Sequence, residues 1–288
     1  MGNDELRSLA RRLRDLVEPI AANVYFAPEA TAAYARLGVE GFGPGYFASR
    51  GGCLGQAPGE VIAAAFGVFK PAMVKVNVDI TWGLTDAAAM RAAREEGAVA
   101  SLTRLFGADA TIAAGIPRAT ELLQRAAAAA APGEARALYS GLTSLGYPGT
   151  RIGDLWRAAD LVREHRGDSH IIAWVANGLD PIEATLSTEL WWRLPFISYV
   201  RTRGWNDEEI GGAVEHLRQA GLIDGEQFTR EGEALRSEIE WVTDRQERPI
   251  VEALGADAEE LLTLLEPMTD AVLAGKGYPR DPRLMTRP

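Results

Sequence analysis

The chain has 288 residues, of which 47% are apolar and 24% are charged, and its formal net charge is −10. This composition is typical of a folded globular protein, and the length suits one large domain or two smaller ones. The single cysteine, Cys53, excludes an internal disulfide framework and a metal site built from several cysteines.

The sequence carries no targeting signal that we can identify. Its first residues lack the basic and apolar regions of a signal peptide. The most apolar window, residues 61–82, is interrupted by Lys70, Lys75 and Asp79, which would be costly in a bilayer. We therefore expect a cytoplasmic protein that makes no contact with a membrane.

Helical periodicity dominates the first 150 residues. It predicts helices over residues 4–23, 28–37, 58–69, 86–106, 118–131 and 134–145. Asp86 is placed as an N-cap, and Pro28 and Pro58 suit first helical positions.

Residues 41–52 contain five glycines among aromatic residues, and this composition predicts a loop. A phosphate-binding loop would need a Lys-Ser/Thr ending between a strand and a helix, which the segment lacks. The alternative is a turn that packs Tyr46 and Phe47 against the core. Tyr46 and Arg50 are also candidates to contact a ligand.

Residues 164–170 form a polar cluster that contains two of the three histidines of the chain. An apolar stripe at helical spacing runs from Ile152 to Val162, and a second one starts at Ile171. The pattern predicts that two helices meet at Gly167. Asp168 would then cap the second helix, with His170 in its first turn.

Three interpretations of this cluster remain open. Arg166 and Asp168 could form a buried ion pair with a structural role only. Alternatively, the cluster is a ligand or catalytic site, because a helix N-terminus beside an arginine attracts anions and a histidine oriented by a carboxylate can transfer protons. A metal site is the third interpretation, but the spacing of the two histidines is not that of a two-histidine zinc helix.

The second interpretation supplies the candidate site residues. The candidate catalytic residues are His165, Asp168 and His170. The candidate ligand-binding residues are Arg166, Tyr46, Arg50 and Trp174. No metal ligand is assigned, and the sequence identifies no cofactor.

The C-terminal half shows helix signals in close succession. Asp180-Pro181 begins a helix through Trp192, a short helix spans 195–203, and Asn206 caps a helix that ends at Gly221. Residues 222–229 then predict a small β-hairpin, and helices follow over 230–247 and 257–273.

This order of elements resembles the MarR-type winged helix, whose wing runs into a Leu-Thr-x-x-Gly-x-x-Leu segment. Phe228, Thr229, Gly232 and Leu235 occupy those positions. The whole chain also resembles SalK-like actinobacterial helix-turn-helix proteins in segments 25–30 (YFAPEA), 45–50 (GYFASR), 163–170 (REHRGDSH) and 203–209 (RGWNDEE).

The resemblance implies a mainly α fold with an N-terminal helical domain packed on a winged helix-turn-helix module that has one hairpin wing. We expect domains over 1–180 and 181–276, with a loose tail over 277–288. Winged modules also form dimerisation surfaces, so a homodimer stays open.

The helix in the recognition position presents acidic residues, among them Asp207, Glu208 and Glu215, and the wing is acidic as well. Residues 181–250 carry six more acidic than basic side chains. DNA-reading modules need cations along the phosphates, so we expect no nucleic-acid partner. The function that we expect is small-molecule binding, with an enzyme of specialised metabolism as one form. A MarR-like DNA-binding regulator that responds to a ligand is the alternative.

Overall fold

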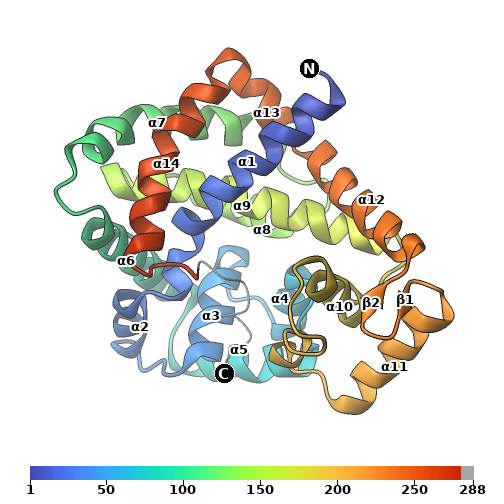
Figure 1. The fold of residues 1–288 in the computed structure, drawn as a ribbon. Coiled ribbons are helices and arrows are strands. Elements are labelled where there is room, and N and C mark those ends of the chain that lie inside the picture. Colours follow the sequence, from blue (N-terminus) through green and yellow to red (C-terminus); the bar gives the residue numbers. More distant parts are fainter. Residues whose placement is uncertain (280–288) are drawn as a thin grey trace.

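The longest helix of the described chain, α9 (Arg151–Ala176), runs through the middle of the molecule and joins two hydrophobic cores (Figure 1). The computed structural model describes residues 1–279. Leu155 and Trp156 of α9 are buried in the first core, whereas Ala173 and Trp174 belong to the second. One helix thus fixes the position of each core relative to the other.

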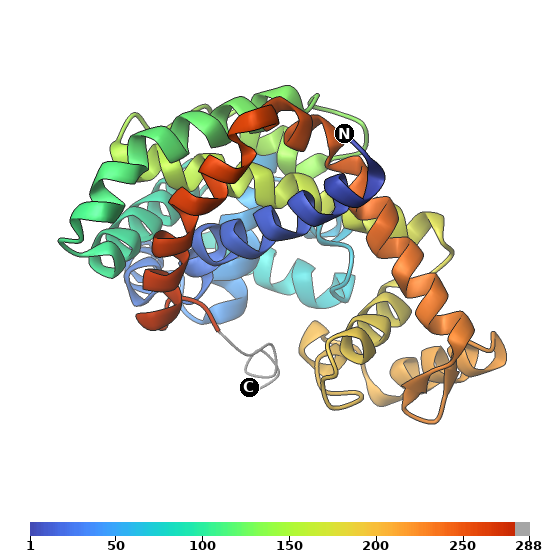
Figure 2. The ribbon, with the colours of Figure 1, turned by 45° about the horizontal axis from the view of Figure 1, so that its top comes forward.

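The first core is enclosed by the N-terminal helices and by the last two helices of the chain. Figure 2 shows α14 lying beside α1. The helices of this unit are α1 (Asn3–Ala22), α2 (Pro28–Ala35), α3 (Phe42–Gly51), α4 (Gly59–Phe66), α5 (Pro71–Leu84), α6 (Ala87–Phe106), α7 (Ala110–Ala129), α8 (Ala137–Thr143), α13 (Arg248–Leu254) and α14 (Ala258–Ala274).

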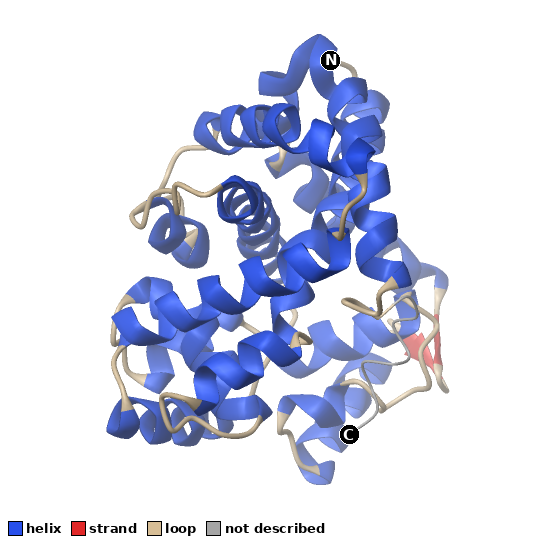
Figure 3. Cartoon of the chain, turned by 90° about the vertical axis from the view of Figure 1, so that its left-hand side faces the viewer, coloured by secondary structure: helices blue, strands red, loops and turns tan. Residues whose placement is uncertain are grey.

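The second core lies within a smaller group of elements to one side (Figure 2). Its helices are α10 (Pro181–Trp191), α11 (Asp207–Gln219) and α12 (Arg230–Gln246), with the strands β1 (Ile223–Asp224) and β2 (Gln227–Phe228). The strands pair antiparallel, with Ile223 opposite Phe228, and they are the only sheet within residues 1–279 (Figure 3). The predicted mainly α fold with a single hairpin wing is confirmed.

The predicted helix starts have the expected chemistry. The Asp86 carboxylate accepts a hydrogen bond of 2.8 Å from the Ala89 amide at the start of α6. Asp180 and Asn206 form capping boxes with Glu183 and Glu209. In each box the capping side chain accepts from the backbone amide of the glutamate, and the glutamate side chain accepts from the backbone amide of the capping residue.

The glycine-rich segment is not a loop, because residues 42–51 form the helix α3. A Cβ added to Gly43 would lie 2.3 Å from Oδ1 of Asn77, and one added to Gly45 would lie 3.0 Å from the Tyr34 ring. The glycines therefore allow α3 to pack closely against its neighbours, rather than providing turns. The sequence pattern also did not predict α5 and α13, and α7 begins eight residues before its predicted start.

The chain does not break at Gly167, because α9 continues through it without interruption. One glycine in a helix interior costs only about 1 kcal/mol relative to alanine, which tertiary packing outweighs here. The predicted helix–helix corner, the N-cap role of Asp168 and the helix-N-terminal position of His170 are therefore wrong.

The predicted second domain includes α13 and α14, but in the structure these helices pack in the first core and not with the winged module. Ile250 of α13 and Leu261 and Met268 of α14 are buried in the first core. The domain boundary at residue 180 stays a prediction. Most of the predicted loose tail lies outside the described residues, but the Gly277 amide donates to the Val272 carbonyl and the Tyr278 ring packs edge-on against Phe26.

Within residues 1–279, every helix is too short or too polar to cross a lipid bilayer.

Candidate functional site

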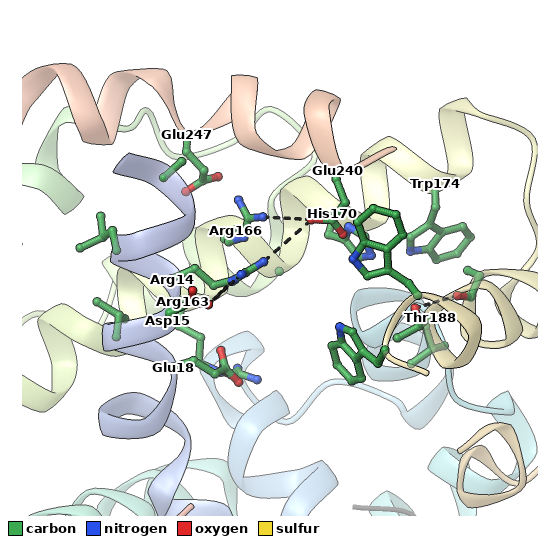
Figure 4. Close-up of a pocket in the computed structure, with 18 of the residues that line it drawn as sticks. Arg14, Asp15, Glu18, Arg163, Arg166, His170, Trp174, Thr188, Glu240 and Glu247 are labelled. Atoms are coloured by element: carbon green, nitrogen blue, oxygen red, sulfur yellow. Dashed lines mark hydrogen bonds and ion pairs between the residues drawn. The ribbon is translucent and has the colours of Figure 1, made fainter. Parts of the chain in front are cut away.

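A cleft of about 600 Å³ lies between the two cores, and it is the best candidate for a binding site. Residues of α1, α9, α10 and α12 line it (Figure 4). Its lining includes arginines and aromatic residues (Arg14, Arg163, Arg166, Arg236, Trp174, Trp191, Trp192, Tyr199 and Tyr278) and four acidic residues (Asp15, Glu18, Glu240 and Glu247). Such a mixture of apolar surface and a few charged groups is typical of small-molecule sites.

One face of α9 supplies the floor of the cleft. Arg163, Arg166, Gly167, His170 and Trp174 all line it, and they follow one another at the spacing of a helical face. Arg166, His170 and Trp174 are thus brought together as the sequence predicted. Arg166, His170 and Trp174 are four residues apart in the sequence. A helix break at Gly167 would assign Arg166 to one helix and the other two residues to the next, so their common face was not predicted.

The predicted Arg166–Asp168 ion pair is wrong. Residues two apart in a continuous helix point in nearly opposite directions. Nη2 of Arg166 instead lies 2.9 Å from Oδ1 of Asp244 and 3.5 Å from Oε2 of Glu240, both on α12. On the other side of α9, Asp168 accepts a 3.0 Å hydrogen bond from the Tyr139 amide in the first turn of α8.

Burial raises the pKa of Asp168 to about 7, against the opposing effect of the Tyr139 amide. The folded state therefore binds a proton more tightly than the unfolded state does. The stabilisation from that proton is complete below the ordinary Asp pKa of about 3.9 and is lost as the pH rises towards 7.

We expect Asp168→Asn to remove this dependence. Relative to the wild type, the variant should gain unfolding free energy between pH 5 and pH 8, because it carries no charge to desolvate. Chemical denaturation of both proteins across this range measures the difference. A difference that does not change with pH would contradict the raised pKa.

His165 is buried outside the cleft, where its Nδ1 lies 2.8 Å from Oε1 of Glu247 and its ring packs edge-on against Tyr139. His170, by contrast, lines the cleft, and its Nδ1 lies 3.1 Å from the Thr243 hydroxyl. That hydroxyl donates its only proton to the Ile239 carbonyl at 2.8 Å, so it must accept from the histidine.

This contact fixes the tautomer of His170 with the proton on Nδ1, which leaves Nε2 as an acceptor. Burial, aided by Arg236 and Arg166, lowers the pKa of His170 to about 4. The imidazole is therefore neutral at pH 7. Nε2 has no hydrogen-bond partner within the described residues.

Tyr46 and Arg50 belong to a separate buried cluster behind α9. Nε and Nη2 of Arg50 donate to the Glu164 carboxylate at 2.8 and 2.7 Å, and its Nη1 donates to the Tyr46 hydroxyl at 3.2 Å. Arg163 donates to the same carboxylate at 2.6 Å. Burial alone would raise the pKa of Glu164, but the two guanidinium groups hold it at about 2. Neither Tyr46 nor Arg50 lines the cleft.

Two arginines of the cleft have unsatisfied donors. Nη1 of Arg166 and Nε of Arg236 are buried, and neither has a hydrogen-bond partner among the described residues. Nη1 of Arg236 lies 2.7 Å from Oε1 of Glu240. Buried donors without an acceptor are costly, so these groups suit a ligand that supplies one. The sequence reading missed Arg236, because only the fold places α12 opposite α9.

The first turn of α11 is docked against the larger unit. Nζ of Lys70 lies 2.7 Å from Oε1 of Glu209, and the Trp205 indole donates to the Val68 carbonyl at 3.0 Å. The exposed side of α11 carries Asp207, Glu208 and Glu215, and its only arginine, Arg218, pairs with Glu215.

Residues 10–279 match a helix-turn-helix family. The chain belongs to this family. Neither the curated proteins nor the solved structures that were compared contain a match. Within the matched residues, α11 is followed directly by the hairpin of β1 and β2.

The described residues contain no group of three or more His, Cys, Asp or Glu side chains arranged to hold a metal ion.

Proposed function

We propose that this helix-turn-helix family member binds a small molecule in the cleft between its two cores. The observation that carries the proposal is the pair of buried arginines with unsatisfied N–H groups in a cavity lined by three tryptophans. A cavity of about 600 Å³ is large enough for a molecule of two or three fused rings. His170, Arg166 and Trp174 are its proposed contacts, together with Arg236, Trp191 and Trp192.

We further propose that the winged module forms a wall of this site and does not read DNA. Residues 207–226, which span α11 and the wing, contain six acidic residues and one arginine. Placed in a major groove, these carboxylates would face phosphates, and the neighbouring cations Lys70, Arg201 and Arg218 are already paired with three of them. This proposal includes the resemblance of the whole chain to SalK-like proteins and that of its winged module to the MarR type.

If the bound molecule is also turned over, His170 is the group that would accept a proton, since its Nε2 is unprotonated. An enzyme would then lose more turnover than affinity in His170→Phe. The carboxylate of Asp168 cannot orient His170, because it lies on another face of α9 and bonds to α8.

The intrinsic fluorescence of the cleft tryptophans provides a test of binding. Three of the seven tryptophans line the cleft, so a ligand should change the intrinsic fluorescence and raise the melting temperature in a small-molecule screen. Trp191→Ala should weaken every such hit without unfolding the protein, because Trp191 is 37% exposed. Hits that bind Trp191→Ala and the wild type equally would contradict the proposed site.

The second candidate function is DNA-binding regulation, which family membership favours. Capture of genomic fragments at physiological salt, followed by gel shifts across a salt series, separates the two. Sequence-specific binding with a steep salt dependence would favour a regulator and overturn the structural role of the winged module.

A further inference from the structure

We infer that the cleft selects an aromatic carboxylate that carries an N–H or O–H donor next to its carboxylate. This inference rests on the proposed binding function and names the chemical class of the ligand. Three features of the cleft each select one part of such a molecule: a pair of arginines, a neutral histidine and a group of exposed tryptophans.

The arginines select the carboxylate. Arg166 on α9 and Arg236 on α12 face the cleft from two different helices, and each has an N–H group without an acceptor. The side chain of Arg236 is only 3% exposed. Burial, with Arg166 and Arg14 nearby, lowers the pKa of Arg236 despite the contact with Glu240. Glu240 and Asp244 pair with other atoms of these guanidinium groups, so a ligand carboxylate oxygen would satisfy a donor that they leave unpaired.

The neutral histidine selects the donor. His170 lies one turn beyond Arg166 on the same face of α9, so a group bound to the arginine is adjacent to the imidazole (Figure 4). Because Nδ1 donates to Thr243, the remaining Nε2 can only accept. A ligand N–H or O–H beside the carboxylate would supply the missing proton donor.

The tryptophans select the aromatic ring. Trp191 and Trp192 are 37% and 42% exposed although they border a cavity, and such exposure of large apolar rings marks a binding surface. The Arg236 guanidinium lies 5.3 Å from the Trp191 ring centre, and Tyr199 packs against Trp192 at 5.9 Å. A flat ring can stack in this group while its carboxylate reaches the arginines.

Three matched compounds test the inference by calorimetry at pH 7.5. Indole-2-carboxylate has the ring, the charge and the adjacent N–H. Indole-2-carboxamide lacks the charge, and 1-methylindole-2-carboxylate lacks the donor. We expect indole-2-carboxylate to bind at least about tenfold more tightly than the amide, as one charge-assisted hydrogen bond of about 1.5–3 kcal/mol implies, and about two- to tenfold more tightly than the N-methyl compound, which loses one neutral hydrogen bond.

Variants assign each preference to its residue. Arg166→Gln should remove the preference for the carboxylate over the amide, and Arg166→Lys, which keeps the charge near Asp244, should retain part of it. His170→Phe should remove the preference for the free N–H over the N-methyl compound. Arg230→Gln is the control, because Arg230 lies outside the cleft with its side chain 92% exposed, and it should leave all three affinities unchanged.

The outcomes separate this inference from the proposed function. Equal binding of the three compounds, or preferences that persist in Arg166→Gln and His170→Phe, would overturn the inference and leave small-molecule binding intact. The same holds if the compounds fail to bind while hits of the fluorescence screen depend on Trp191. If no compound of either set binds, both proposals fall.

Discussion

Replacing Glu164 with alanine is expected to lower the free energy of unfolding by about 3–5 kcal/mol, the usual cost of breaking a buried ion pair. Glu164 is 1% exposed and accepts hydrogen bonds from Arg50 and Arg163. Its removal would leave two guanidinium groups in the interior without their common partner. Urea denaturation at pH 7, followed by circular dichroism, measures the loss.

The matched control is Glu96→Ala, which breaks the ion pair of Glu96 with Arg36 on the surface. Both side chains are more than half exposed, so the loss should stay below about 1 kcal/mol. Comparable losses in the two variants would show that the buried cluster contributes no more than a surface pair.

The free energy of unfolding of the wild type should fall at acidic pH for the same reason as in Glu164→Ala. The folded-state pKa of Glu164 is about 2, below its ordinary value of 4.5. Its contribution to stability is therefore present above about pH 4.5 and is lost as the pH falls towards 2.

The second large effect is expected at Gly167, where leucine should block ligand binding without loss of stability. A Cβ at this position meets no atom closer than 3.5 Å, and the residue lines the cleft. The leucine side chain would start beside Oε2 of Glu164, 3.5 Å from its Cβ, and its outer atoms would occupy the part of the cavity that Gly167 lines. Leucine is also a better helix former than glycine by about 0.8 kcal/mol. We expect at least a tenfold loss of affinity for any ligand found in the screen, and a melting temperature no lower than that of the wild type.

Gly211→Leu is the control for this variant. Gly211 lies in α11, away from the cleft, and a Cβ there has open space around it. The substitution makes the same helix-forming change and should leave affinity unaltered. Undiminished binding in Gly167→Leu would place the ligand elsewhere.

The sequence predicted the second half of the fold well because its signals are local. The N-caps Asp180 and Asn206 and the hairpin at 223–228 follow from residues that are close in the chain. The inward side of α11, which includes Ile210 and Leu217, also follows from helical periodicity.

The errors occur where tertiary contacts override local preference. Gly43 and Gly45 are typical of a loop, but they allow α3 to approach Asn77 and Tyr34. Gly167 is typical of a helix end, but α9 is packed on both sides of it. In α3 the glycines provide space for neighbouring groups, which a single sequence does not reveal.

The candidate site could be predicted only in part. His170, Arg166 and Trp174 share one helix, so their proximity follows from the sequence once the helix is continuous. Arg236, Glu240 and Asp244 lie at the same spacing on α12, about 70 residues later, and only the fold brings them to the same cleft.

The continuity of α9 also determines how the chain can be divided. Its 26 residues extend for about 39 Å, and its C-terminal end supplies Ala173 and Trp174 to the second core. A fragment that starts at residue 181 would lose this wall, and one that ends at residue 180 would lose α13 and α14 from the first core. We therefore expect the protein to unfold as one cooperative unit, and we expect its winged module to need α9 when it is exchanged between relatives.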